Sequence, residues 1–391
     1  MDTLHTVLNR GCSMWDRARL PEQEFRQRLG LVRDGMRQQG LGLLLVYGDS
    51  RRYGDLAFVS HFIPKNRGAL AIIPLDGEPA LVVQEPSRNN PFSKTLTWID
   101  EVHSVGQFAQ GLSEAVKARA LKPKNVGLVA VKEQLNIREC NALVKVLDGA
   151  RISDCSDLLS SLRVIKSPAE IALLQESSEI LSEALSLFEN EVKPGQKEYE
   201  IMALLDREAR RRGAEDFRFL IARSSQPEIG LRPASSSTVE KGEALLISVA
   251  ASHQRCWAEL GRTFCLGSPP QQLFKSHGLA KNMFQKLAES IKAGASAAAA
   301  GAWLKEVPFP GVRESLQAYG LGNGIGLEMI ELPYLGADGS VPIQSGMVLT
   351  LRVCMTGKDS GCALIAQPYQ VTESGLEPLV KPVTDLISVG N

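Results

Sequence analysis

Apolar residues recur at two different spacings in the first part of the chain. From about Glu22 to Gly40 they fall three or four positions apart, which is typical of a helix that buries one side. Elsewhere they form short, near-continuous runs, which are typical of buried strands. Strands that alternate with helices favour an α/β domain, which we expect over residues 1–161. Its predicted elements are a helix at 22–40, a strand at 41–48, two strands around an Asp-Gly turn at 68–83, a strand at 125–131 and a helix at 136–148.

A second region begins at a strong helix start signal. Ser167 can cap the helix, Pro168 suits its first position, and Glu170 can complete a capping box. Apolar residues then continue along one side as far as Phe188. We expect this second domain to cover residues 162–391. Its other predicted helices follow residues 193–200 up to Gly213 and cover 273–294.

A predicted β-hairpin lies near the centre of this second region. The run 244–251 reads as a buried strand, residues 253–257 turn, and 258–267 form the second strand. Two such strands can direct Ser248 and Glu259 into one pocket, while Arg262 and Thr263 brace the second strand. On pattern alone, a purely structural hairpin is the favoured interpretation.

Composition excludes several classes of function. The 391 residues include 44 acidic and 44 basic side chains, and this zero net charge argues against a general nucleic-acid or membrane-surface binder. No apolar run approaches the roughly 20 residues of a membrane span, and the N-terminus lacks a secretory apolar segment. Seven scattered cysteines without a CxxC pair favour a reducing, cytoplasmic location. The five histidines form no zinc signature such as HExxH.

The hairpin and the segments after it resemble the creatinase, Xaa-Pro aminopeptidase and methionine aminopeptidase family, which has the pita-bread fold. The family pattern has an Asp at the end of a strand, ten residues, a second Asp, and then x-T-R-T-F. Here the register is kept, but the two Asp positions hold Ser248 and Glu259, followed by Gly261, Arg262 and Thr263. The resemblance implies a creatinase-like α/β N-terminal domain and an α+β pita-bread C-terminal domain.

The resemblance also implies where metal ligands would lie. Metal-dependent members use two Asp, one His and two Glu, and Glu331 keeps the position of a further glutamate in an H-E-x-P pattern whose His is Ile330 here. Arginine cannot lose its proton in a protein and would repel a metal cluster. We therefore predict no metal ion and no cofactor. The five ligand positions hold Ser248, Glu259, Asn323, Arg352 and either Ala366 or Gln367.

Arg352 carries a specific structural prediction. A buried unpaired cation is too costly, so Arg352 should pair with Glu259 or receive an anionic substrate. Asn323 could hydrogen-bond a ligand or be no more than a tolerated replacement. Glu331 could equally be a structural hydrogen-bond acceptor, and Arg262 could be no more than a brace of the hairpin.

Metal-free members of the family imply other site residues. Creatinase and ectoine hydrolase use a His as a proton shuttle, and that position holds Leu231 here, next to Arg232. Glu331, Glu259 or His253 would then have to handle protons.

These members also use arginines to hold the substrate carboxylate, some of them from the N-terminal domain of the partner subunit, and they imply a homodimer. Arg67 with Lys65 lies roughly where such a clamp is expected, although an ordinary solvated loop charge is an equal alternative.

Three hypotheses of function follow. The first is a metal-independent enzyme acting on a small polar molecule with a carboxylate, by C–N hydrolysis, a lyase step or a cyclisation. The alternative is a non-catalytic pseudo-peptidase that binds a peptide or protein partner in the former cleft, and an aminopeptidase with rewired metal ligands is third. For the first, the candidate catalytic residues are Glu259, Glu331 and Arg352, and the candidate substrate-binding residues are Arg67, Arg232, Asn323, Arg262, Ser248 and Gln367.

Overall fold

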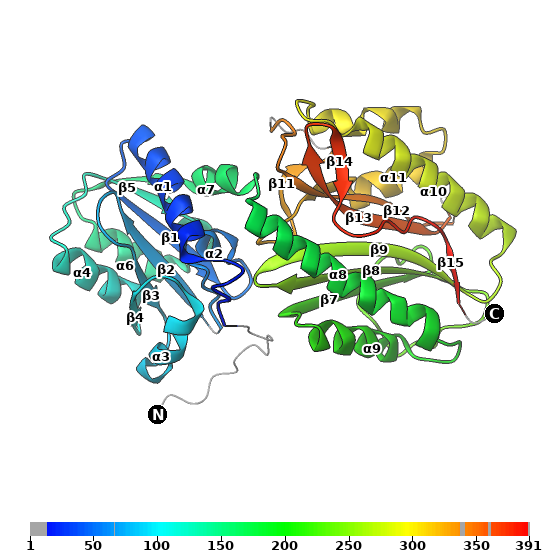
Figure 1. The fold of residues 1–391 in the computed structure, drawn as a ribbon, viewed down its shortest axis with the longest axis horizontal. Helices are drawn as coiled ribbons and strands as arrows, with labels where there is room; N and C mark the ends of the chain where they lie inside the picture. Colours follow the sequence, from blue (N-terminus) through cyan, green and yellow to red (C-terminus); the bar gives the residue numbers. More distant parts are fainter. Residues whose placement is uncertain (1–13, 66, 337–340, 359–360, 390–391) are drawn as a thin grey trace. The chain divides into compact units, whose positions relative to one another are not determined.

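The computed structural model describes residues 14–65, 67–336, 341–358 and 361–389, and it divides the chain into two compact units. The first unit ends at Arg163 and the second begins at Val164. Each unit has its own sheet and its own hydrophobic core (Figure 1). In the part of the chain that the structure describes, no helix is long and apolar enough to cross a membrane.

The first unit is built on a mixed sheet with the strand order β4-β3-β2-β1-β5-β6. Its centre is β1, which pairs antiparallel with β2 and parallel with β5. Both β1 and β2 are buried along nearly their whole length, as strands covered on two faces must be. The strands are β1 (Leu43–Asp49), β2 (Gly68–Pro74), β3 (Ala80–Val83), β4 (Glu101–Ser104), β5 (Asn125–Val129) and β6 (Arg151–Asp154).

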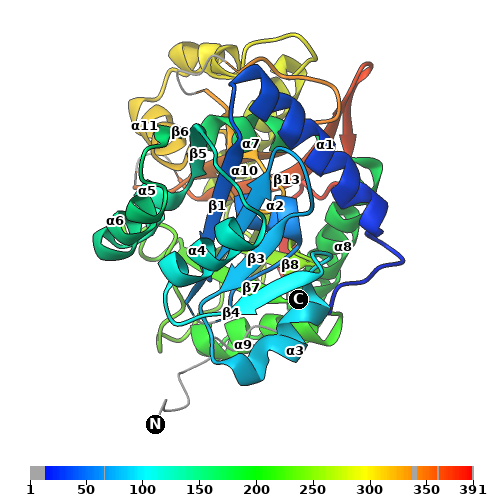
Figure 2. The same cartoon turned by 90° about the vertical axis from the view of Figure 1, so that its left-hand side faces the viewer.

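Helices lie on both faces of this sheet (Figure 2). Phe108, Leu112 and Leu143, from α4 and α6, join the core of one face. The predicted elements of this unit are present, and the hairpin of β2 and β3 turns at Gly77 with φ +98°. The helices are α1 (Glu22–Gln38), α2 (Gly54–Ser60), α3 (Asn90–Ser93), α4 (Phe108–Ala118), α5 (Val131–Gln134), α6 (Ile137–Val146) and α7 (Ser156–Arg163), with 3-10 turns at Ser87–Asn89 and Lys94–Leu96.

The second unit is built on one large sheet with the strand order β11-β10-β12-β13-β9-β8-β7. Strand β14 pairs with β13, and β15 pairs with β9. The predicted hairpin is confirmed, because β8 and β9 pair antiparallel along their length, and it lies between β13 and the edge strand β7. The strands are β7 (Asp216–Arg223), β8 (Ala244–His253), β9 (Cys256–Leu266), β10 (Gly322–Gly324), β11 (Glu331–Tyr334), β12 (Val348–Met355), β13 (Ala363–Thr372), β14 (Gly375–Pro378) and β15 (Ile387–Val389).

Helices cover one face of this sheet, and Figure 1 shows α8 crossing β8 and β9. The capping box predicted for α8 is confirmed, since Ser167 Oγ accepts from the Glu170 backbone N–H and the Glu170 carboxylate accepts from the Ser167 N–H. Apolar residues of α8 and α9 pack on β7, β8 and β9, and those of α10 and α11 pack on β12 and β13. The helices are α8 (Pro168–Glu191), α9 (Glu198–Arg211), α10 (Gln271–Ser290) and α11 (Pro310–Tyr319), with a 3-10 helix at Ala298–Glu306.

Strand alternation separates the helix-covered face from the opposite one. Val249 and Leu260 lie in the core beneath α8, and Leu351 and Ile365 lie in the core beneath α10. Since successive side chains of a strand point to opposite faces, their neighbours in sequence point away from the helices. A separate small cluster on that side confirms the alternation, and its members are Ala222, Leu246, Cys354, Cys362, Leu364 and Ala366.

Candidate functional site

Five strands bring the positions predicted as ligands onto the face opposite the helices, and Asn323 of β10 lies there because it is across from Thr350, two positions before Arg352. Arg352 lies directly across from Ala366, Ala366 across from Gly261, and Gly261 across from Ser248. This register also decides between the two alternatives for the fifth position, because Ala366 shares a face with Arg352 and Gln367 does not. We call this surface the site face, and define it by Ser248, Glu259, Asn323, Arg352 and Ala366.

A bidentate ion pair occupies the middle of the site face. Arg352 Nε donates to Glu259 Oε1 at 3.1 Å, and Arg352 Nη2 donates to Glu259 Oε2 at 2.5 Å. The two side chains are only 15% and 7% exposed. Burial disfavours the cation, but the Glu259 carboxylate outweighs it and raises the pKa of Arg352 above its ordinary value. The predicted pairing of Arg352 with Glu259 is confirmed.

Further contacts hold this pair in place. Arg352 Nη1 donates to the Tyr319 carbonyl at 3.3 Å, and Nη2 lies 3.4 Å from Asn323 Oδ1. Asn323 Nδ2 in turn donates to the carbonyls of Gly324 at 2.7 Å and Met329 at 3.0 Å. Asn323 is therefore held in place by both ends of its amide.

The side chains of the site face do not suit a dinuclear metal site. Two divalent cations need several carboxylate or imidazole ligands to replace their water, whereas these five positions supply one carboxylate. That carboxylate is already bound by a guanidinium. Among the described residues, no group of three or more His, Cys, Asp or Glu side chains is arranged to hold a metal ion.

Glu331 belongs to a second buried ion pair. Lys166 Nζ lies 2.8 Å from Glu331 Oε2, and the Glu328 backbone N–H donates to Glu331 Oε1 at 3.0 Å. The Lys166 and Glu331 side chains are 2% and 5% exposed. Lys166 precedes α8 and Glu331 begins β11, so this pair ties the two segments together.

Arg262 and Gln367 are on the other face, which corrects their predicted contact with substrate. Arg262 Nη1 donates to the Ala366 carbonyl at 2.9 Å, and Nη2 donates to Gln367 Oε1 at 2.8 Å. Gln367 Nε2 donates to the Val380 carbonyl at 2.9 Å. Burial lowers the pKa of Arg262 to about 10. Alternation excludes these two side chains from the site face, and the contacts match the alternative of Arg262 as a brace.

Arg232 is likewise turned away from the site face. Its two terminal nitrogens donate to the Glu198 carboxylate of α9 at 2.6 and 2.7 Å. Burial disfavours the Glu198 carboxylate, but hydrogen bonds from Arg232 and Ser235 outweigh it and lower the pKa of Glu198 to about 2. Leu231, in the predicted shuttle position, packs against the apolar cluster of the site face. The prediction that Arg232 binds substrate is corrected by this pairing.

His253, the third candidate for proton handling, lies at the turn of the hairpin. Its Nδ1 is 3.0 Å from the Gly213 carbonyl, and its Nε2 is 3.4 Å from a Glu176 oxygen of α8. Alternation along β8 puts it on the same side as Val249, facing the helices. His253 is therefore a structural side chain.

Arg67 belongs to the first unit and is exposed there. It lines a cavity of about 300 Å³ together with Lys65, Glu85 and Arg88. Lys65 Nζ stacks 3.6 Å from the centre of the Phe92 ring. Burial raises the pKa of Glu85, although hydrogen bonds from serine side chains oppose it. The cavity is predominantly basic, and the role of Arg67 stays a prediction.

A larger cavity adjoins the apolar part of the site face. It measures about 550 Å³ and is lined by Ala244, Glu228, Lys358 and Cys362 among others. Burial raises the pKa of the Cys362 thiol to about 11, which makes it a poor nucleophile at neutral pH. The cavity therefore has room for a small molecule and both polar and apolar lining residues, and Cys362 does not supply a nucleophile there.

Sequence reasoning missed several neighbours of the candidate site. Lys166 and Tyr319 lie far from their partners in sequence, and the sequence does not show which residues they contact. Arg218, Leu220 and Trp257 also lie on the site face, because Arg218 pairs across from Ala250 and Trp257 precedes Glu259 by two positions. An alternation count along β7 would have found Arg218 and Leu220 once that strand was predicted.

Comparison with known proteins agrees with the fold of both units. Residues 28–165 match the creatinase/prolidase N-terminal domain, and residues 172–373 match metallopeptidase family M24. The chain belongs to family M24. The resemblance inferred from the hairpin is confirmed, and so is the fold class of a creatinase-like N-terminal domain with a pita-bread C-terminal domain.

Relatives of this M24 protein are peptidases. The Xaa-Pro dipeptidase of Pyrococcus furiosus is 26% identical over 66% of this chain and 71% of its own length. An uncharacterised hydrolase/peptidase of Sinorhizobium fredii is 23% identical over 92% of this chain and 95% of its own. The crystal structure of the X-Pro aminopeptidase of Thermotoga maritima superposes with a TM-score of 0.80 at 20% identity, covering 92% of this chain and 99% of that one.

Proposed function

We propose that this M24 protein is a metal-independent enzyme that acts on a small polar molecule bearing a carboxylate. The observation that carries the proposal is the ion pair of Glu259 with Arg352, which lies where the resemblance places metal ligands. A metal ion bound by Glu259 would have to displace the Arg352 guanidinium from that carboxylate. The displaced guanidinium would remain close to the ion and repel it. Separating a buried ion pair costs about 3–5 kcal/mol, and nothing in the five side chains offsets that cost.

Two observations support a small substrate with a carboxylate. The cavity of about 550 Å³ has the size of ordinary small-molecule sites. The relatives named Xaa-Pro dipeptidases act, by their names, on dipeptides, which are small and carry a free carboxylate. A metal-free site can bind such a group through arginine, which matches a carboxylate in charge and geometry.

The chemistry left to this site is proton transfer and charge stabilisation. Glu259 is the carboxylate of the site face and is the proposed general base, while Arg352 stabilises negative charge that develops on the substrate. Glu331 steadies the segment around β11 through its pair with Lys166. These groups suit a lyase step, a cyclisation, or C–N hydrolysis in which Glu259 takes a proton from an attacking water molecule.

The test is a screen of EDTA-treated protein for binding and turnover. Amino acids, guanidino and amidino acids and short proline-containing peptides are screened by thermal shift, and those that stabilise the protein are followed by mass spectrometry. A ligand at 100 times its dissociation constant should add about 2.7 kcal/mol of stability. We expect product with wild-type protein and none with Glu259→Gln. Product formation that requires an added divalent metal would contradict the proposal.

A non-catalytic binding protein is the second candidate, and one observation favours it. The predicted shuttle position and the fifth ligand position hold Leu231 and Ala366, and both side chains belong to one apolar patch on the site face. Such a protein would bind a ligand equally well as wild type and as Glu259→Gln, and neither would yield product.

A further inference from the structure

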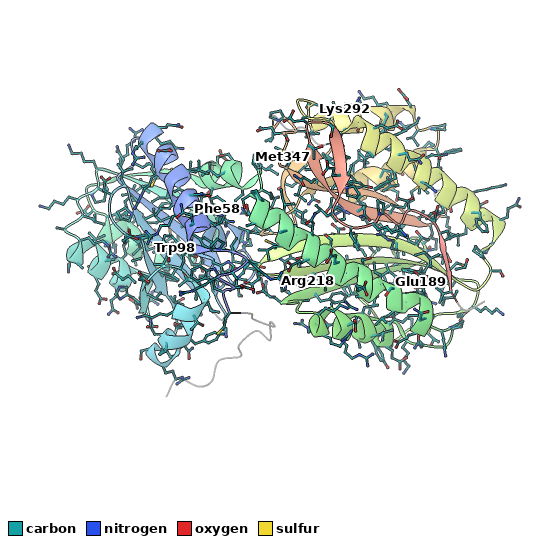
Figure 3. All side chains as sticks on the ribbon, viewed as in Figure 1. Phe58, Trp98, Glu189, Arg218, Lys292 and Met347 are labelled. Carbon is teal, nitrogen blue, oxygen red and sulfur yellow. The ribbon has the colours of Figure 1, made fainter. Side chains whose placement is uncertain are left out.

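The site face is accessible along β7. Arg218 lies across from Ala250, and Leu220 lies across from Ser248, so both side chains share the face with Glu259. The Arg218 side chain is 55% exposed and Leu220 is 38% exposed, and Figure 3 labels Arg218 on this strand. Ser248 beside them is half-buried. This edge therefore presents a cation, an apolar side chain and a hydroxyl to a ligand.

Arg352 is poorly placed to bind the carboxylate of a ligand. It already holds Glu259 with two hydrogen bonds and is only 15% exposed. A ligand carboxylate would have to displace a buried carboxylate of the protein, which would then lie unpaired. The substrate's negative charge needs a different partner.

Arg218 has the properties that Arg352 lacks. Its Nη2 donates to Asp216 Oδ2 at 3.1 Å, and the Arg218 side chain is 55% exposed whereas that of Asp216 is 13% exposed. Much of the Arg218 guanidinium therefore faces solvent, and a ligand carboxylate can bind to it there without displacing Asp216. The guanidinium also lies 5.9 Å from the centre of the Trp257 ring, which limits its orientations before a ligand arrives.

We propose that Arg218 binds the carboxylate of the ligand and that Leu220 contacts a short apolar part of it. This assignment rests on the proposed function. It restricts the class of ligand to carboxylates that carry an apolar group at about one residue's length from the carboxylate. Leu220 is exposed, so binding an apolar part of the ligand against it would remove apolar surface from water and favour binding. Leu220 lies two positions from Arg218 on the same face.

The experiment compares N-acetyl-L-proline with N-acetyl-L-prolinamide, which has the same shape without the charge. Dissociation constants are measured by calorimetry on the full-length, EDTA-treated protein. We expect wild type to prefer the acid by about tenfold, as one charged hydrogen-bonded pair predicts. Arg218→Gln should abolish this preference, and Arg218→Lys should keep part of it.

Three further variants sharpen the test. Asp216→Asn removes the neighbouring negative charge and should tighten binding of the acid without changing binding of the amide. Leu220→Ala should weaken acid and amide equally. Arg211→Gln is the matched control, because Arg211 is also an exposed arginine paired with a carboxylate, that of Glu208, but lies on α9; it should change neither constant.

The outcomes separate the two proposals. If Arg218→Gln keeps the preference for the acid, the assignment to Arg218 is wrong while the proposed function stands. If wild type shows no preference for the acid, both the assignment and the carboxylate-bearing substrate fail. Melting temperatures of all variants identify any change that comes from unfolding.

Discussion

Removing one member of the central ion pair should destabilise this M24 protein strongly. In Arg352→Met, the Glu259 carboxylate keeps its burial, with 7% of the side chain exposed, and loses its two hydrogen bonds. An uncompensated buried charge of this kind costs about 3–5 kcal/mol. Glu259→Met should cost a similar amount, because it strands the Arg352 guanidinium.

The double variant Glu259→Met/Arg352→Met gives the decisive comparison. It removes both charges and fills the space with apolar side chains, so most of the loss should be recovered. We would measure the free energy of unfolding by urea titration, following the transition of the second unit through Trp257, which is 4% exposed in the folded protein. Lys281→Met is the control, because the Lys281 and Asp385 side chains are 37% and 79% exposed and their ion pair should contribute no more than about 1 kcal/mol.

Two results would refute this reasoning. Single variants that cost less than about 1 kcal/mol would mean that the pair behaves as a solvated surface contact. A double variant whose loss equals the sum of the two singles would mean that the charges are not coupled. Either result would remove the main argument against a metal ion at this place.

Two further predictions concern the surroundings of the site. Glu198 has an ordinary pKa of 4.5 and a folded pKa of about 2, so its contribution to stability is full above pH 4.5 and is lost as the pH falls towards 2. Arg232→Met should therefore move acid unfolding, followed by circular dichroism, to higher pH; an unchanged midpoint would show that the pair does not matter. Gly230 has φ +71°, and an added Cβ there would overlap the Tyr319 hydroxyl. Gly230→Ala should cost about 1–3 kcal/mol of unfolding free energy, and less in a Tyr319→Phe background, whereas equal costs in both backgrounds would exclude the overlap as a cause.

Much of the fold could be predicted because its signals are local. The capping box of Ser167 and Glu170 lies within four residues, and the turn at Gly77 joins two adjacent strands. The hairpin also fixed the relation of Ser248 to Glu259, since alternation and a short turn determine which residues share a face. These features need no knowledge of distant contacts.

The partners of the charged residues could not be predicted in the same way. Arg232 meets Glu198 across 34 positions, and Arg262 meets Gln367 across 105. Such contacts depend on which strands and helices are neighbours, and a sequence pattern does not specify this. The pairing of Arg352 with Glu259 was predictable because the resemblance had already placed both residues in one site.

The choice between Ala366 and Gln367 shows the same limit. One position along β13 moves a side chain to the opposite face, and counting back from a distant motif cannot fix a register to one residue. The pairing of Ala366 with Gly261 and with Arg352 resolves it at once.

The most direct test of metal independence is a calorimetric titration of manganese(II) into EDTA-stripped wild-type protein. The account predicts no saturable binding, because the Glu259–Arg352 pair occupies the place of the ligands and the other three positions supply no carboxylate or imidazole. Tight binding of about two ions per chain would contradict it and would mean that the ion pair opens to form a metal site.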